Sequence, residues 1–192
     1  MKFRAVSLNR LDHHIVMDIC KWRNQDFVRE KMVNQHIISE DEHIRFIEKM
    51  KKDDNRNLFV FYLDDEPFEV FQYEIFPERN AATCGNYLIS RDYQQMGYGA
   101  IGDYFIGEII FDYLKIKKLE FEVLGCNEKL LARSKKNARF AGEEIIDTDN
   151  NGKKSELFHF VSFADERKRN PKLESAVWTF VDKEPMENML II

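Results

Sequence analysis

The sequence lacks the features that mark nucleic-acid-binding, membrane and disulfide-stabilised proteins. Its net charge is −5, and its longest basic cluster is the three residues 167–169, so we expect no nucleic-acid partner. No apolar stretch approaches a membrane span, and the N-terminus shows no signal-peptide pattern, so we expect no membrane association. Cys20, Cys84 and Cys126 have no paired spacing, which favours a cytoplasmic location over a disulfide frame or a zinc site.

What is present describes a soluble globular protein. Of its 192 residues, 44% are hydrophobic and 33% are charged, which leaves enough apolar material for a substantial core. Sixteen Phe and seven Tyr are many for this length, and we expect most of them in the core. We predict one domain over residues 1–163 and a C-terminal tail of unknown role over residues 164–192.

Periodicity and turn signals predict the order β, α, α, β, β, β, α, β, α, β, β. Ser39 and Glu42 have the spacing of a capping box at the start of the third helix. Strands are expected at residues 3–8, 58–63, 68–76, 82–90, 119–125, 141–147 and 156–163, with a hairpin turn at 150–152. Helices are expected at residues 12–24, 25–33, 40–52, 98–115 and 127–137.

The stretch between the strand at 82–90 and the helix at 98–115 is the most informative part of the chain. It reads Gln-Gln-Met-Gly-Tyr-Gly-Ala over residues 94–100. Glycines let the backbone approach a ligand, and the first turn of a helix presents unpaired N–H groups, so the segment predicts a phosphate or pyrophosphate site. No Gly-Lys-Ser/Thr follows, which excludes a Walker loop. From these residues alone, a loop that uses glycine only to turn a corner is an equal alternative.

Gln94, Gly97 and Gly99 match the Q/R-x-x-G-x-G/A element of the GCN5-related N-acetyltransferases, and the order of elements resembles theirs. The resemblance implies an α/β (α+β) fold with a mixed, mostly antiparallel central sheet that is split in the middle and flanked by helices. It implies acetyl-CoA as cosubstrate, with no metal. The cofactor-binding residues that it implies are Leu88, Ile89, Ser90, Gln94, Gln95, Met96, Gly97, Tyr98, Gly99, Ala100, Asn127 and Ser134.

Three further stretches resemble a narrower branch of that family. They are residues 22–24, residues 38–48 and the Glu122-Val123 pair that is followed by Asn127. They are similar to bacterial N-acetyltransferases of nucleotide-linked amino sugars, as in the pseudaminic-acid pathway, and more loosely to ribosomal-protein and spermidine N-acetyltransferases. The resemblance implies acetyl transfer to a primary amine by direct attack in a ternary complex, with a sugar nucleotide as the best guess for the acceptor. The alternatives are a protein N-terminus, a polyamine or an inactive CoA-binding module, and homodimers are common among relatives.

The catalytic groups are less defined than the cofactor turn. Many relatives carry a tyrosine, the acid for the leaving thiolate, where this chain has Ser134, so we predict that water protonates the thiolate. The glutamate that ribosomal-type relatives carry on the central strand is absent from residues 83–86. The remaining candidates for the base are Glu74, whose alternative is a solvent-facing strand residue, and Glu122, whose alternative is support of the split sheet. His159 has a structural alternative too, and the other four histidines are expected at the surface or in caps.

Overall fold

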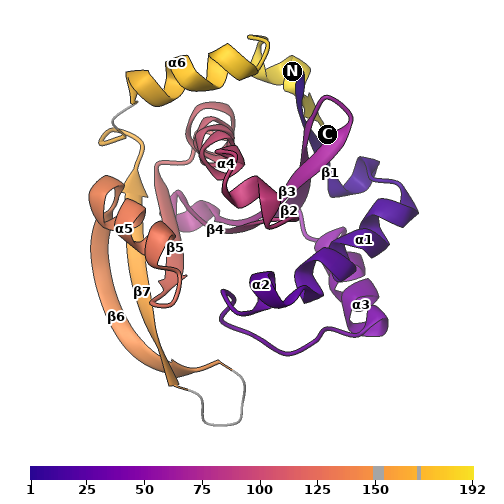
Figure 1. Cartoon of the computed structure of the whole chain (residues 1–192), viewed down its shortest axis with the longest axis vertical. Coiled ribbons are helices and arrows are strands. Elements are labelled where there is room, and N and C mark those ends of the chain that lie inside the picture. Colours follow the sequence, from indigo (N-terminus) through magenta and orange to yellow (C-terminus); the bar gives the residue numbers. More distant parts are fainter. Residues whose placement is uncertain (149–153, 168–169) are drawn as a thin grey trace.

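The computed structural model describes residues 1–148, 154–167 and 170–192, and it contains one mixed sheet with helices on both faces (Figure 1). The strand order across the sheet is β6-β7-β5-β4-β3-β2-β1-β8. The strands are β1 Phe3–Ser7, β2 Arg56–Leu63, β3 Glu66–Phe76, β4 Ala81–Leu88, β5 Lys118–Leu124, β6 Arg139–Asp147, β7 Lys154–Phe163 and β8 Leu190–Ile191. The helices are α1 His13–Asn24, α2 Asp26–Arg29, α3 Glu40–Met50, α4 Tyr98–Gly107, α5 Glu128–Asn137, α6 Pro171–Phe180 and α7 Met186–Met189. The expected fold class is confirmed.

The sheet opens between β4 and β5. These two strands are parallel and pair only from Ala81↔Lys118 to Thr83↔Glu120, although β4 continues to Leu88 and β5 to Leu124. On its other side β4 stays paired with β3 along its whole length. Beyond Thr83 the backbone of β4 therefore presents a free edge toward the gap, and this gap is the expected split.

Each face of the sheet is covered by its own set of helices (Figure 1). On one face α4 packs against β1 to β4, where the ring of Phe105 stacks on Phe3 at 3.6 Å between centroids. On the opposite face α1 and α3 enclose a second apolar cluster, which includes Ile19, Ile47 and Val70. A third, smaller cluster joins α5 to β5 and β7. Aromatic and aliphatic side chains that alternate along the strands supply all three clusters.

Several local predictions are confirmed and others need correction. The capping box is present, because Ser39 N donates to Glu42 Oε2 at 2.8 Å and Glu42 N donates to Ser39 Oγ at 3.3 Å. The helix expected at 25–33 is wrong beyond α2, because the Arg29 side chain donates to carbonyls on both sides of the turn and holds the chain in a loop. The helix expected at 98–115 divides into α4 and a π-helical stretch, Glu108–Tyr113.

Two elements among the described residues after 163 pack onto the rest of the fold. Trp178 of α6 packs edge-on against Tyr104 and Phe105 of α4, at 5.7 and 5.9 Å between centroids. β8 pairs in parallel with β1 at the edge of the sheet. The expected hairpin turn at 150–152, and two of the three residues of the basic cluster, lie outside the described residues. No helix in the described ranges is long and apolar enough to cross a bilayer.

Candidate active site

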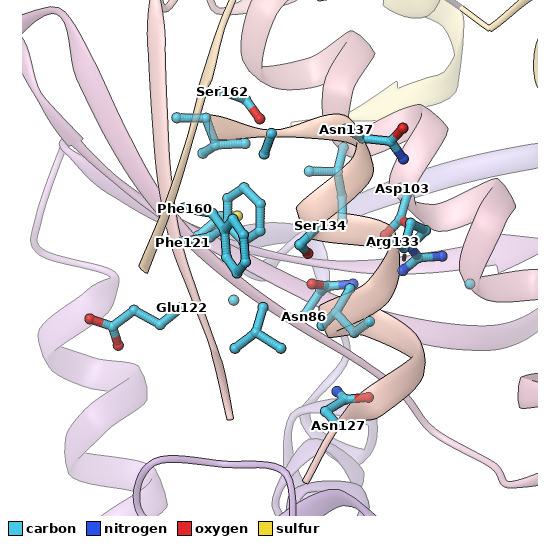
Figure 2. Close-up of a pocket in the computed structure, with 18 of the residues that line it drawn as sticks. Asn86, Asp103, Phe121, Glu122, Asn127, Arg133, Ser134, Asn137, Phe160 and Ser162 are labelled. Carbon is cyan, nitrogen blue, oxygen red and sulfur yellow. Dashed lines mark ion pairs between the residues drawn. The ribbon is translucent and has the colours of Figure 1, made fainter. Parts of the chain in front are cut away.

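A large cavity lies at the split in the sheet, with a volume of about 2050 Å³. Its walls come from β3, β4, β5 and β7, from α4 and α5, and from the segment after α1. Figure 2 shows Ser134 of α5 facing Asn86 of β4, with Arg133 and Asn137 on the same helix and Asn127 just before it. A cavity for one small molecule measures roughly 300–1,000 Å³, so this volume has room for two substrates.

The glycine turn lines this cavity. Gly97 has φ +84°, in the left-handed region, and it is the N-cap of α4. A Cβ on Gly97 would meet no atom within 4 Å, so the position needs glycine for its backbone angle rather than for space. The rings of Tyr93 and Tyr98 stack at 4.6 Å and hold the turn on both sides of Gly97. The unpaired N–H groups at the start of α4 thus lie beside the cavity, as an anion site requires.

The structure gathers much of the predicted cofactor set around this opening. Seven of its members line the cavity: Leu88, Gln94, Gly97, Gly99, Ala100, Asn127 and Ser134. The other five lie around it. Ile89 is buried in the cluster beneath α1, Ser90 Oγ accepts from Asp92 N, and Met96 is 65% exposed. Gln95 and Tyr98 lie within the turn itself.

The three predicted catalytic residues line the cavity but lie on different faces of the sheet. Ser134 is buried on α5, and its side chain faces Asn86 across the pocket (Figure 2). Glu122 points to the opposite side of β5 from Phe121, away from α5 (Figure 2). Glu74 lies on the same face as Glu122, where it forms an ion pair with Arg56 at 3.6 Å. Ser134 is therefore separated from both carboxylates by the plane of the sheet.

Sequence reasoning missed Glu69, a fully buried carboxyl group on β3 that lines the cavity. Asn86 Nδ2 donates to Glu69 Oε1 at 2.5 Å, and Oε2 has no hydrogen-bond partner in the described part of the chain. Burial, and then the nearby Asp103 carboxylate, raise the pKa of Glu69 to about 8, so the group is protonated at neutral pH. The available signal was a charged residue between Phe68 and Val70 in an otherwise apolar run.

An ion pair near Glu69 links α4 to α5. Arg133 Nη2 lies 2.6 Å from Asp103 Oδ2, and both side chains line the cavity (Figure 2). Burial raises the pKa of Asp103 to about 6, and Arg133 opposes that rise. The two residues are thirty positions apart in sequence, so only the packing of the two helices reveals the pair.

On the opposite face, Glu122 is brought together with two residues from neighbouring strands. His159 Nδ1 of β7 lies 3.3 Å from Glu122 Oε1, and His159 Nε2 lies 3.0 Å from Glu144 Oε1 of β6. His43, expected at the surface or in a cap, is instead buried, and its Nε2 donates to Val16 O at 2.7 Å. Within the described ranges, no three His, Cys, Asp or Glu side chains are grouped to hold a metal ion.

A sheet split beside a glycine turn and a helix N-terminus fits the resemblance to the GCN5-related N-acetyltransferases, and comparison with known proteins supports that resemblance. No protein-family profile matches the chain. In sequence it is similar to acetyltransferase PseH of Campylobacter jejuni, with 29% identity over 119 residues, 62% of this chain and 73% of the relative.

Solved structures share the fold. A crystal structure of Campylobacter jejuni PseH in complex with acetyl coenzyme A has a TM-score of 0.59 at 20% identity, covering 84% of this chain and 98% of that one. Spermidine N-acetyltransferase from Vibrio cholerae, in complex with CoA and spermine, has a TM-score of 0.74 at 15% identity, covering 86% and 96%. At these identities the structural likeness concerns the fold.

Proposed function

We propose that the protein transfers the acetyl group of acetyl-CoA to a primary amine by direct attack in a ternary complex. The observation that carries the proposal is the position of the split. After Thr83, β4 is no longer paired with β5, and the chain then continues from this open edge to Gly97 and the start of α4. The open edge of β4 can therefore pair with the amide groups of a pantetheine arm, and the N–H groups at the start of α4 can bind a pyrophosphate. The family likeness and the acetyl coenzyme A complex of PseH support the same assignment.

Residues on both sides of the split would bind the cofactor and assist the reaction. Leu88 at the end of β4, and Ser90 just beyond it, would supply backbone donors for the pantetheine arm and for the oxyanion that forms during attack; Ile89 N already donates to Phe68 O. Asn127, the N-cap residue of α5, and Ser134, on α5, line the other wall of the cavity. A serine hydroxyl is a weak acid, so water rather than Ser134 would protonate the leaving thiolate. Glu122 lies just beyond the last β4–β5 pair and lines the cavity, and we propose that it acts on the amine.

For the acceptor we propose a nucleotide-linked amino sugar. Arg23 and Lys31 both line the cavity, and they contribute positive charge on the side where α1 and α2 close it. The Arg23 Nη2 group donates to Asn34 O, and Nη1 has no hydrogen-bond partner among the residues that the structure describes. Guanidinium groups bind phosphate through paired N–H donors, so this end of the cavity suits a diphosphate.

A polyamine is the second candidate, and a different observation favours it. The face of the sheet that Glu122 shares with Glu74 also carries Glu120 and, further out, Glu144. A row of carboxylates attracts a cationic acceptor and repels a nucleotide diphosphate. The spermidine N-acetyltransferase whose fold this chain shares makes polyamines a practical test substrate.

Calorimetric titration with acetyl-CoA, free CoA and ATP tests the cofactor assignment first. We expect both CoA forms to bind and ATP to bind much more weakly, because ATP lacks the pantetheine arm. Thiol release is then measured with UDP-glucosamine, spermidine and a peptide that bears a free N-terminus. Absence of CoA binding would overturn the proposal, and turnover of spermidine but not of UDP-glucosamine would reverse the order of the two acceptors.

A further inference from the structure

Three neighbouring strands bring Glu122, His159 and Glu144 into one line. Glu122 of β5 is the register partner of His159 of β7, and Gly142 of β6 pairs with His159 on its other side. Glu144 lies two residues beyond Gly142 and therefore on the same face of the sheet. The imidazole contacts one carboxylate through each ring nitrogen, at 3.3 Å on the Glu122 side and 3.0 Å on the Glu144 side.

This line starts at the point where the sheet opens. The last β4–β5 pair is Thr83↔Glu120, and Glu122 follows two residues later on the same face. Glu122 and His159 both line the cavity. Glu144 lies on β6, the edge strand, and its side chain is 56% exposed. The three groups therefore lead from the cavity to solvent at the edge of the sheet.

The arrangement contributes little to folding. Ion pairs between groups as exposed as Glu122 and Glu144 are worth about 0–1 kcal/mol. Folding stability therefore does not explain why one histidine contacts two carboxylates. The apolar cluster formed by Val123, Phe158 and α5 lies on the other face of the sheet and does not involve this line of groups. An imidazole with a partner at each nitrogen has the geometry to accept a proton at one nitrogen and release one from the other.

We propose that Glu122 takes the proton from the acceptor ammonium and that His159 passes it to Glu144 and on to water. The inference rests on the proposed acetyl transfer, which requires the amine to be neutral. An N–H bond of the ammonium breaks as an O–H bond forms on Glu122. That proton moves to Nδ1 of His159, the Nε2 proton moves to Glu144, and Glu144 releases its proton to solvent. Charge balances at each step, and the neutral amine is left in the cavity.

Other charged groups face the same region and can affect the pH dependence of the rate. Glu74 on β3 is paired with Arg56 of β2, and Glu120 on β5 is paired with Lys118. The segment after α2 brings Lys31 to this side of the cavity, where its Nζ donates to Cys126 O. These groups already have partners, so Glu122 and His159 remain the pair at the open end of the split.

The test compares three variants that remove a proton-transfer group and keep a polar side chain, Glu122→Gln, His159→Gln and Glu144→Gln. The matched control is Glu143→Gln, which removes an exposed carboxylate one residue away on the opposite face of β6. Rates of thiol release are measured from pH 6.5 to 9.5 with saturating acetyl-CoA and with spermidine or UDP-glucosamine, whichever the wild type acetylates. Acetyl-CoA binding is measured for each variant by calorimetry.

At pH 7 we expect Glu122→Gln to lower kcat/KM for the amine about 100-fold, and the other two variants to lower it about 10-fold, with acetyl-CoA affinity unchanged. The deficits should shrink as pH rises toward the pKa of the amine, because a neutral amine needs no base. A loss that is uniform across pH, or wild-type rates for His159→Gln and Glu144→Gln, would overturn the relay. Failure of the wild type itself to bind acetyl-CoA would instead overturn the proposed function.

Discussion

The carboxyl group of Glu69 on β3 lies directly against the α-carbon of Gly102 on α4. A Cβ on Gly102 would lie 1.6 Å from Glu69 Oε2 and 2.5 Å from its Cδ. Real Cβ atoms do not approach a neighbour so closely, so the buried carboxyl occupies the space that a side chain at position 102 would need. The glycine is therefore required by its partner on the sheet and not by its backbone angle.

Replacement of Gly102 by alanine should destabilise the fold. The added methyl group must displace a fully buried carboxyl or move α4 away from the sheet, and such overpacking typically costs about 1–3 kcal/mol. Urea unfolding measures the loss. Gly99→Ala is the control in the same helix, because a Cβ there would lie 3.7 Å from Leu88 Cδ1, an ordinary contact.

A double variant separates the contact from other effects of alanine at position 102. When Glu69→Ala is already present, Gly102→Ala should cost much less, because the clashing carboxyl has gone. The difference between the two costs is the coupling free energy of the pair. Equal costs in both backgrounds would contradict the contact.

Glu69→Gln should stabilise the protein by an amount that depends on pH. The pKa of Glu69 is raised to about 8 in the folded state and is about 4.5 when unfolded, so between these values the folded chain binds one more proton. Wild-type stability therefore falls as pH rises through this window and levels off above it. Glutamine mimics the protonated acid and does not ionise, so the free energy of unfolding of the variant should exceed that of the wild type by up to about 5 kcal/mol at high pH.

Urea unfolding at pH 5, 7 and 9 checks this expectation. The gain of the glutamine variant over wild type should be small at pH 5 and largest at pH 9. The exposed Glu66, on the same strand, provides the control variant Glu66→Gln, which should show no such trend. A gain that does not change with pH would mean that Glu69 is not protonated in the folded state.

A matched pair of substitutions at Gly97 tests the anion site. Asn and Asp have nearly the same shape, and both tolerate the left-handed backbone that Gly97 adopts at φ +84°. They differ in charge beside the N–H groups of α4. We expect Gly97→Asp to weaken acetyl-CoA binding at least about tenfold relative to Gly97→Asn, as calorimetry would measure. Equal affinity in the two variants would mean that no phosphate lies at the turn.

Ser134→Ala tests whether the serine acts as an acid. The side chain is buried on α5 and faces Asn86. Because a serine hydroxyl is a poor acid, we expect kcat to fall by less than about tenfold, with the shape of its pH profile unchanged. A fall of 100-fold or more with unaltered acetyl-CoA affinity would assign Ser134 a direct part in proton transfer.

Much of the architecture was accessible from the sequence because the signals are local. The capping box at Ser39 and Glu42, the alternation along the strands and the glycine turn at Gly97 each depend on residues a few positions apart. The resemblance to the GCN5-related N-acetyltransferases rests on the same turn and on element order. Together these signals were enough to predict the split sheet and the likeness to acetyltransferases.

The tertiary structure alone decided which side chains meet at the site. Glu69 finds Asn86 and Gly102 only because β3, β4 and α4 stack there, and Glu122 reaches His159 and Glu144 only through the register of three strands. Burial raises the pKa of Glu69, and burial is a property of the assembled layers. The sequence by itself determined where the chain turns, caps and alternates, because local physics sets those features. The identity of neighbours that are distant in sequence depends on packing and strand register, which local patterns leave open.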